Sequence, residues 1–140
     1  MVLRQNWRKE VILMQDKYII VTNNPLVLEK YNESRKVVFE ETSYEGILKV
    51  IRDKIHEGYI LLTHPLSGSV KPNETPYKSV LISGEKRRLD SDSLMLIESA
   101  IQACQKFQMK ADKYAAHVYS DFQIIDLGLL ESAMMSADTL

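Results

Sequence analysis

Polar side chains that could bind or transform a small molecule follow two short apolar runs, at 18–22 and 59–63. Continuous apolar runs of this length are typical of strands that are covered on both faces. Ligands of open α/β sheets bind beyond the carboxyl ends of such strands, so we expect the residues after both runs to line one crevice. The candidate ligand-binding residues are Thr22, Asn23, Asn24, Thr63, His64, Ser67, Gly68, Ser69, Lys71, Asn73, Tyr77 and Lys78.

The segment 67–71 indicates an anion site. Gly68 lets the backbone turn its N–H groups toward a negative charge, and a helix that begins after Asn24 would point its positive end at the same place. Phosphate or a carboxylate is the natural ligand for such a site. The sequence contains no glycine-rich nucleotide motif, and the alternative is a loop ordered by its own serine and asparagine hydrogen bonds.

His64 is the candidate catalytic residue, because an imidazole can act as an acid or a base near neutral pH. The alternative is a ring that bonds loop carbonyls. His56 and His117 have no metal-ligand partner at useful spacing, and we interpret both as surface residues. Cys104 lies on an apolar helical stripe, which favours a buried structural thiol over a nucleophile. No cofactor can be named from these residues.

Hydrophobic periodicity predicts alternating strands and helices. Strands are expected at 18–22, 36–40, 59–63 and 78–82, and helices at 25–31, from a Thr42–Glu45 capping box to Gly58, at 91–109, and from a second capping box at Ser120 to about 134. Asn24 is the expected N-cap of the first helix, and Pro25 suits its first position. The buried faces predicted for the last two helices are Leu94, Ile97, Ala100, Ile101, Cys104 and Phe107, and Phe122, Ile125, Leu129 and Met134.

This order of elements predicts an α/β fold, namely a small Rossmann-like three-layer domain with a mainly parallel four-stranded sheet. In this arrangement the strands at 18–22 and 59–63 are neighbours. The loop at 64–76 suits either a hairpin or a crossover, so the direction of the last strand is left open. Loops of this length in compact domains are often functional.

The chain has the length and composition of one globular domain. It has 140 residues, of which 45% are hydrophobic and 26% charged. We assign 1–17 to an N-terminal extension with a short helix, 18–135 to the domain and 136–140 to a frayed tail; Met14 is an alternative start. Trp7, with apolar residues at 11–13, gives the extension a side that could cover this chain's own core or a second subunit, which makes a homo-oligomer an open possibility.

Charge and cysteine content narrow the functional classes. The formal net charge is −1, which disfavours nucleic acid as a partner. A single cysteine cannot form an intramolecular disulfide and suits the reducing cytoplasm. The apolar runs are too short for a membrane span, and the N-terminus lacks the features of a signal peptide. A cytoplasmic protein that binds neither nucleic acid nor membrane is expected.

Three segments resemble the GrdX family, small proteins encoded with the glycine, sarcosine and betaine reductases of anaerobic bacteria. They are YIIVTNNP at 18–25, LTHPLSGSVKPNETPYKS at 62–79 and DFQIIDL at 121–127, within a resemblance that covers about 14–135. The resemblance implies an accessory role in amino-acid reduction. It implies no activity, cofactor or catalytic residue.

Three functional hypotheses follow. The first is a binding or accessory module that holds a small anionic ligand or docks on a reductase component. The second is an enzyme of unknown reaction that uses His64 as acid or base, with Lys71 or Lys78 steadying negative charge. The third is a structural assembly partner, which predicts a large apolar surface patch. The sequence shows no recognisable nucleophile, carboxylate pair or metal cluster, which favours the first.

Overall fold

A three-stranded mixed sheet forms the centre of the molecule, whose computed structural model describes residues 17–66, 74–106 and 114–139. The strands are β1 (Tyr18–Thr22), β2 (Val37–Phe39) and β3 (Ser79–Ser83), in the order β2-β1-β3. β1 is parallel to β2 and antiparallel to β3. The central strand is buried along its whole length.

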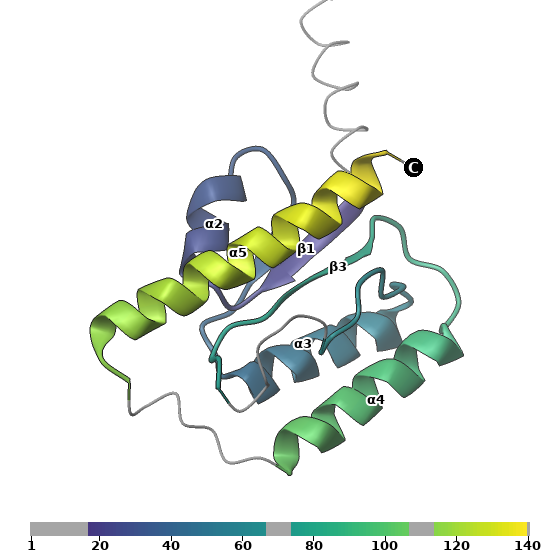
Figure 1. The fold of residues 1–140 in the computed structure, drawn as a ribbon. Helices are drawn as coiled ribbons and strands as arrows, with labels where there is room; N and C mark the ends of the chain where they lie inside the picture. Colours follow the sequence, from purple (N-terminus) through teal and green to yellow (C-terminus); the bar gives the residue numbers. More distant parts are fainter. Residues whose placement is uncertain (1–16, 67–73, 107–113, 140) are drawn as a thin grey trace, which may run out of the picture.

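Helices cover both faces of this sheet. Figure 1 shows α3 (Tyr44–Glu57) and α4 (Ser91–Gln105) on one face, and α2 (Pro25–Tyr31) and α5 (Ala116–Asp138) on the other. Successive residues of a strand point to opposite faces of the sheet, so alternate side chains of each strand pack against the two helix layers. Ile19 and Ile82 pack with α3 and α4, whereas Ile20 and Leu81 pack with α2 and α5.

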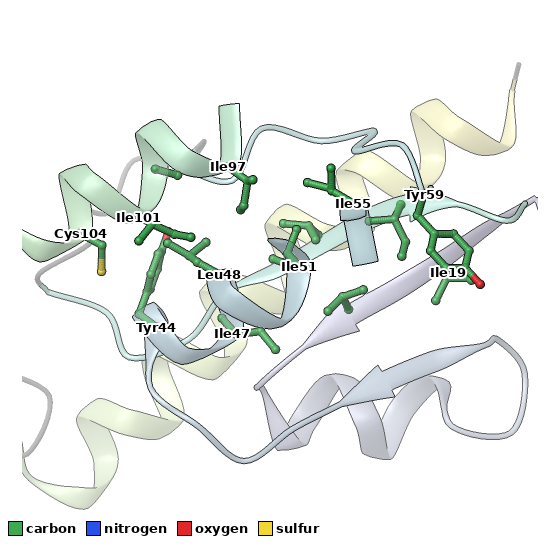
Figure 2. Close-up of a cluster of buried hydrophobic side chains, with 14 residues drawn as sticks. Ile19, Tyr44, Ile47, Leu48, Ile51, Ile55, Tyr59, Ile97, Ile101 and Cys104 are labelled. Atoms are coloured by element: carbon green, nitrogen blue, oxygen red, sulfur yellow. The ribbon is translucent and has the colours of Figure 1, made fainter. Parts of the chain in front are cut away.

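The amphipathic stripe of α3 supplies most of the larger core. Figure 2 shows Tyr44, Ile47, Leu48, Ile51 and Ile55 directed into this cluster, and each is at most 3% exposed. The stripe predicted from the spacing is therefore confirmed, as is the buried position of Cys104 on α4.

Capping residues set the ends of the helices. Asn24 caps α2 with Pro25 at the first position, as predicted, and Gly58 ends α3 in the left-handed conformation at φ 111°. The N-cap of α3 is Ser43, which accepts the Gly46 amide, and not Thr42. α5 begins at Ala116, before the capping box expected at Ser120.

The prediction of a Rossmann-like domain with a mainly parallel four-stranded sheet is wrong. The described residues form three strands, β3 runs antiparallel to β1, and the expected strand at 59–63 makes only an isolated bridge between Leu61 and Ile82. Side chains interrupt the ladder, because the Ile60 amide donates to Ser83 Oγ and the Leu61 amide to Ser93 Oγ. This segment also lies beside β3, so it is not a neighbour of β1.

The predicted buried face of α5 is confirmed at Met134 and wrong at Ile125 and Leu129. Met134 is buried against the sheet, but Ile125 and Leu129 are 42% and 41% exposed, and Leu130, which was not predicted, is buried. The face is rotated because Asp126, one helical turn before Leu130, is buried at the sheet with its carboxyl group hydrogen-bonded. Two further predictions lie outside the described residues. They are the N-terminal helix, of which only Lys17 is described, and the buried position of Phe107.

Two glycines provide a matched test of this fold. A Cβ at Gly58 would lie 2.1 Å from the Arg87 carbonyl oxygen and would need a left-handed backbone, so Gly58→Ala should lower the free energy of unfolding by about 2 kcal/mol. A Cβ added at Gly128, inside α5, would meet no atom within 4 Å, so Gly128→Ala should add roughly 0.5–1 kcal/mol. Urea denaturation measures both. Equal effects of the two substitutions would contradict the geometry at Gly58.

Candidate functional site

A buried polar network joins α5 to the ends of β1 and β3, and its centre is the carboxyl group of Asp126. Asp126 Oδ2 accepts hydrogen bonds from Ser79 Oγ at 2.6 Å and from Asn24 Nδ2 at 2.9 Å, and Oδ1 accepts one from the Ser79 amide at 3.1 Å. Ser79 Oγ also lies 2.6 Å from Thr22 Oγ1. These four residues, here called the Asp126 network, are each at most 7% exposed.

Burial shifts the pKa values of two ionisable groups in this region, Asp126 and Lys78. Loss of hydration raises the pKa of Asp126, although hydrogen bonds from Ser79 and Asn24 and the charge of Lys78 oppose the shift. Lys78 is 6% exposed. Burial lowers the pKa of its ammonium group, and the charge of Asp126 opposes that change. The charge of Lys78 therefore favours ionised Asp126, and the charge of Asp126 favours protonated Lys78, in a site with little access to water.

Asn23 ties together three chain segments next to the network. Its Nδ2 donates to the Thr42 carbonyl at 2.9 Å and to the Pro76 carbonyl at 2.8 Å, and its Oδ1 accepts the Lys78 amide at 2.9 Å. At 4% exposed, the Asn23 side chain is a buried clamp. It fixes the segment after β2 and the segment before β3 against the end of β1.

A pocket of about 500 Å³ opens where these segments meet. Its walls come from the start of α2, the end of β2 with the residues that follow it, and the segment that leads into β3. The lining residues are Asn23, Pro25, Leu28, Phe39, Glu41, Thr42, Pro76 and Tyr77. We call this the β1-end pocket.

Tyr77 is held at the pocket by α5. Its hydroxyl accepts a hydrogen bond from Gln123 Nε2 at 2.9 Å, and its amide donates to Thr75 Oγ1 at 3.2 Å. The opposite wall contains Thr42, which lies very close to Gly46 of α3. A side chain at Gly46 would collide with Thr42 Oγ1, so this wall depends on the glycine. The pocket is thus positioned by contacts from α3 and α5 as well as from the strands.

The structure brings together five of the residues predicted from the sequence: Thr22, Asn23, Asn24, Tyr77 and Lys78. Asn23 and Tyr77 line the pocket, and Thr22 and Asn24 belong to the Asp126 network. Asn24 Oδ1 accepts the Leu26 amide, so it caps the first turn of α2. Ser67, Gly68, Ser69, Lys71 and Asn73 lie outside the described residues, so the anion site in that segment stays a prediction.

Thr63 and His64 lie elsewhere. Thr63 Oγ1 accepts the Leu81 amide at 3.1 Å, on the side of β3 away from β1. His64 is exposed, its Nδ1 accepts the Leu66 amide at 3.0 Å, and it is not part of the pocket lining. The expectation that the residues after both apolar runs share one crevice is not met at Thr63 and His64, because β3 separates the two runs. Tyr77, at the far end of the segment that follows the second run, does line the pocket.

Sequence reasoning missed Ser79, Gln123 and above all Asp126. A signal for Asp126 was present, because it shares a helical face with Leu130 and Met134 at intervals of four residues. A carboxyl group on a buried stripe requires polar partners, and the polar residues at the end of β1 supply them.

Neither a metal-binding group nor a membrane-spanning helix is present in the described part of the chain. Its histidine, cysteine, aspartate and glutamate residues form no group of three that could hold a metal ion. Among the helices of the described ranges, none is long and apolar enough to cross a membrane.

The Asp126 network predicts a pH dependence of stability. The raised pKa means that the folded state favours protonated Asp126, so this group's contribution to stability is complete below the unfolded pKa of about 4 and is lost as pH rises through the folded pKa. The stability of the wild type relative to Asp126→Asn should therefore fall as pH rises above about 4. Urea denaturation from pH 3 to 8 measures it.

Substitutions on α5 provide the controls for this prediction. Asp126→Ala, which leaves three donors unpaired, should cost about 3 kcal/mol. Asp121→Asn, at an exposed position of the same helix, should change neither the stability nor its pH profile. A relative stability that stays constant or increases with pH would show that Asp126 is not held as described.

The comparisons with known proteins place the chain in a family. A family model described as GrdX-like protein matches residues 19–135, which include all of β1 except Tyr18, the pocket, the Asp126 network and most of α5. No curated protein and no solved structure matches the chain. The family match confirms the resemblance seen in the sequence and supports an association with operons of the glycine reductase type. The chain belongs to the GrdX-like family.

Proposed function

We propose that this protein is an accessory binding protein of glycine reductase-type systems, and that its ligand site is the β1-end pocket. Family membership supports the first part. The pocket supports the second, because small-molecule sites are largely preformed concavities with mostly apolar walls and a few placed polar groups.

The observation that carries the proposal is the Asn23 clamp. A surface hollow between loops would close or change shape unless its walls were fixed. Asn23 links both walls through carbonyl oxygens of Thr42 and Pro76, and it does so with a side chain that is almost completely buried. Ordering the site before a ligand arrives reduces the entropy lost on binding.

The enzymatic alternative depended on His64. A general acid or base must lie within hydrogen-bond reach of the bound molecule, and His64 is outside the lining of the β1-end pocket. The predicted partners of His64 in that mechanism were Lys71, which lies outside the described residues, and Lys78, which is buried. These positions favour binding over acid–base catalysis at this pocket.

A second candidate function is docking on a reductase component, and the outer face of α5 favours it. Four large apolar side chains are exposed there: Ile124 at 60%, Ile125 at 42%, Leu129 at 41% and Met135 at 71%. Apolar side chains gathered on one helix face are typical of protein contact surfaces. A reductase component is the occupant that the operon association suggests, and a second copy of this chain is the competing occupant.

Thermal denaturation with a panel of compounds tests the binding function. A ligand that binds only the folded state, at about 100 times its Kd, should add roughly 2.7 kcal/mol and raise the melting temperature. The panel contains glycine, sarcosine, betaine, phosphate and nucleotides. Leu28→Trp should fill the pocket and abolish the increase, whereas Leu96→Trp, on α4 in the opposite helix layer, should not.

The same panel separates the pocket from the predicted anion site. If phosphate stabilises the protein and Gly68→Val or Lys71→Ala removes the effect while Leu28→Trp does not, the ligand binds the 67–71 segment. A response that survives all three substitutions would rule out both sites.

Docking predicts a different result. Leu129→Glu should abolish co-elution with purified glycine reductase components in size-exclusion chromatography, because it places a charge in the apolar face of α5. Met95→Glu, at an exposed apolar position on α4, should leave co-elution intact. If Leu129→Glu instead converts a dimer of the protein alone into a monomer, the occupant of α5 is a second copy.

A further inference from the structure

The lining of the β1-end pocket carries negative charge and no basic group among the described residues. Glu41 is the one acidic side chain among the described residues of the lining. Glu41 is exposed and makes no ion pair with any residue in the described ranges. Glu40, directly before it, is also exposed but does not line the pocket. A second anion placed beside Glu41 would be repelled, whereas a cation would be attracted.

The hydrogen bonds at the pocket also favour a cation over an anion. Both N–H groups of the Asn23 amide are already donated, to the Thr42 and Pro76 carbonyls. The Asn23 side chain therefore offers a ligand no donor. The carbonyl oxygens that receive these bonds each keep a second lone pair, so Thr42 and Pro76, one on each wall, retain acceptor capacity. Acceptors suit a positively charged group.

Aromatic and aliphatic side chains complete the lining. Phe39 and Tyr77 both border the pocket, and the faces of such rings attract organic cations. Pro25 and Leu28 add an apolar wall from α2. The positive end of α2 acts against a cation, but α2 has only seven residues and its first turn is capped by Asn24 Oδ1.

We propose that the β1-end pocket binds a small organic ammonium ion, with the positive group between Glu41 and the rings of Phe39 and Tyr77 and the apolar part against Leu28. This inference rests on the proposed function, since it names the ligand class of the same pocket. It separates that class from the anion predicted at 67–71, which concerns other residues.

A pair of isosteres tests the charge directly. Choline and 3,3-dimethyl-1-butanol have the same shape, but only choline carries a positive charge on its trimethyl group. Isothermal titration with the full-length protein should show choline binding at least about fivefold more tightly than the neutral compound. Choline affinity should also fall as sodium chloride is raised from 20 to 500 mM, because Glu41 is exposed to solvent.

Neighbouring glutamates provide the matched variants. Glu41→Gln should weaken choline binding roughly three- to fivefold and reduce its salt dependence, whereas Glu40→Gln should leave both unchanged. Phe39→Leu should weaken choline more than it weakens the neutral isostere. Circular dichroism melting of each variant verifies that it remains folded.

Three results distinguish the ligand class from the pocket itself. If the neutral isostere, or an anion, binds the wild type as well as choline does and Leu28→Trp abolishes that binding, the ammonium inference is wrong and the pocket stands. If Glu41→Gln and Glu40→Gln weaken choline equally, the inference is also wrong. If neither isostere nor any compound of the earlier panel shows binding that Leu28→Trp abolishes, the proposed function fails as well.

Discussion

The buried carboxyl group of Asp126 determines how α5 lies on the sheet. The helix has two apolar faces: Ile124, Ile125 and Leu129 are exposed to solvent, whereas Leu130 and Met134 are buried. Large apolar side chains occur on both faces, so apolar content does not by itself distinguish them. Asp126 does, because its oxygens accept three hydrogen bonds from Ser79 and Asn24 when α5 presents Leu130 and Met134 to the sheet.

That choice has consequences beyond the helix. Dehydration of a carboxyl group is costly, and a network of this kind offsets the cost only when every partner is in place. The same hydrogen bonds therefore fix the end of β1 and the start of β3, and through Asn24 they fix the first turn of α2. Gln123, one turn before Asp126, then reaches Tyr77 at the pocket. The packing of α5, the geometry of the strand ends and the shape of the pocket therefore all depend on the Asp126 carboxyl group.

Features that depend on residues close together in the sequence could be predicted. The α3 stripe, the Asn24 cap and the Gly58 stop each follow from the properties of a few adjacent side chains, and all three are present. The same holds for the single buried Cys104. In these places local preference and the final fold agree.

Features that depend on distant partners could not be predicted. The run at 59–63 has the composition of a buried strand, yet Ser83 and Ser93, more than 20 residues away, take its backbone donors. The α5 face depends on Ser79, 47 residues before Asp126. For the candidate site, the residues directly after β1 were found because strand ends are visible in sequence. Glu41, Thr42 and Gln123 were missed because only the fold brings them to β1.

The 59–63 segment has a further consequence for how the molecule behaves in a crowded solution. An exposed strand at the edge of a sheet is a template for pairing with another chain, and proteins protect such edges. Here the segment covers the outer side of β3, where the Leu62 amide bonds the Leu81 carbonyl at 2.9 Å and the Ser83 amide bonds the Ile60 carbonyl at 2.8 Å. Its Leu61 amide is taken by the Ser93 hydroxyl on α4. At the opposite edge, β2 is only three residues long. Both margins of the sheet are thereby poor templates for aggregation by strand addition.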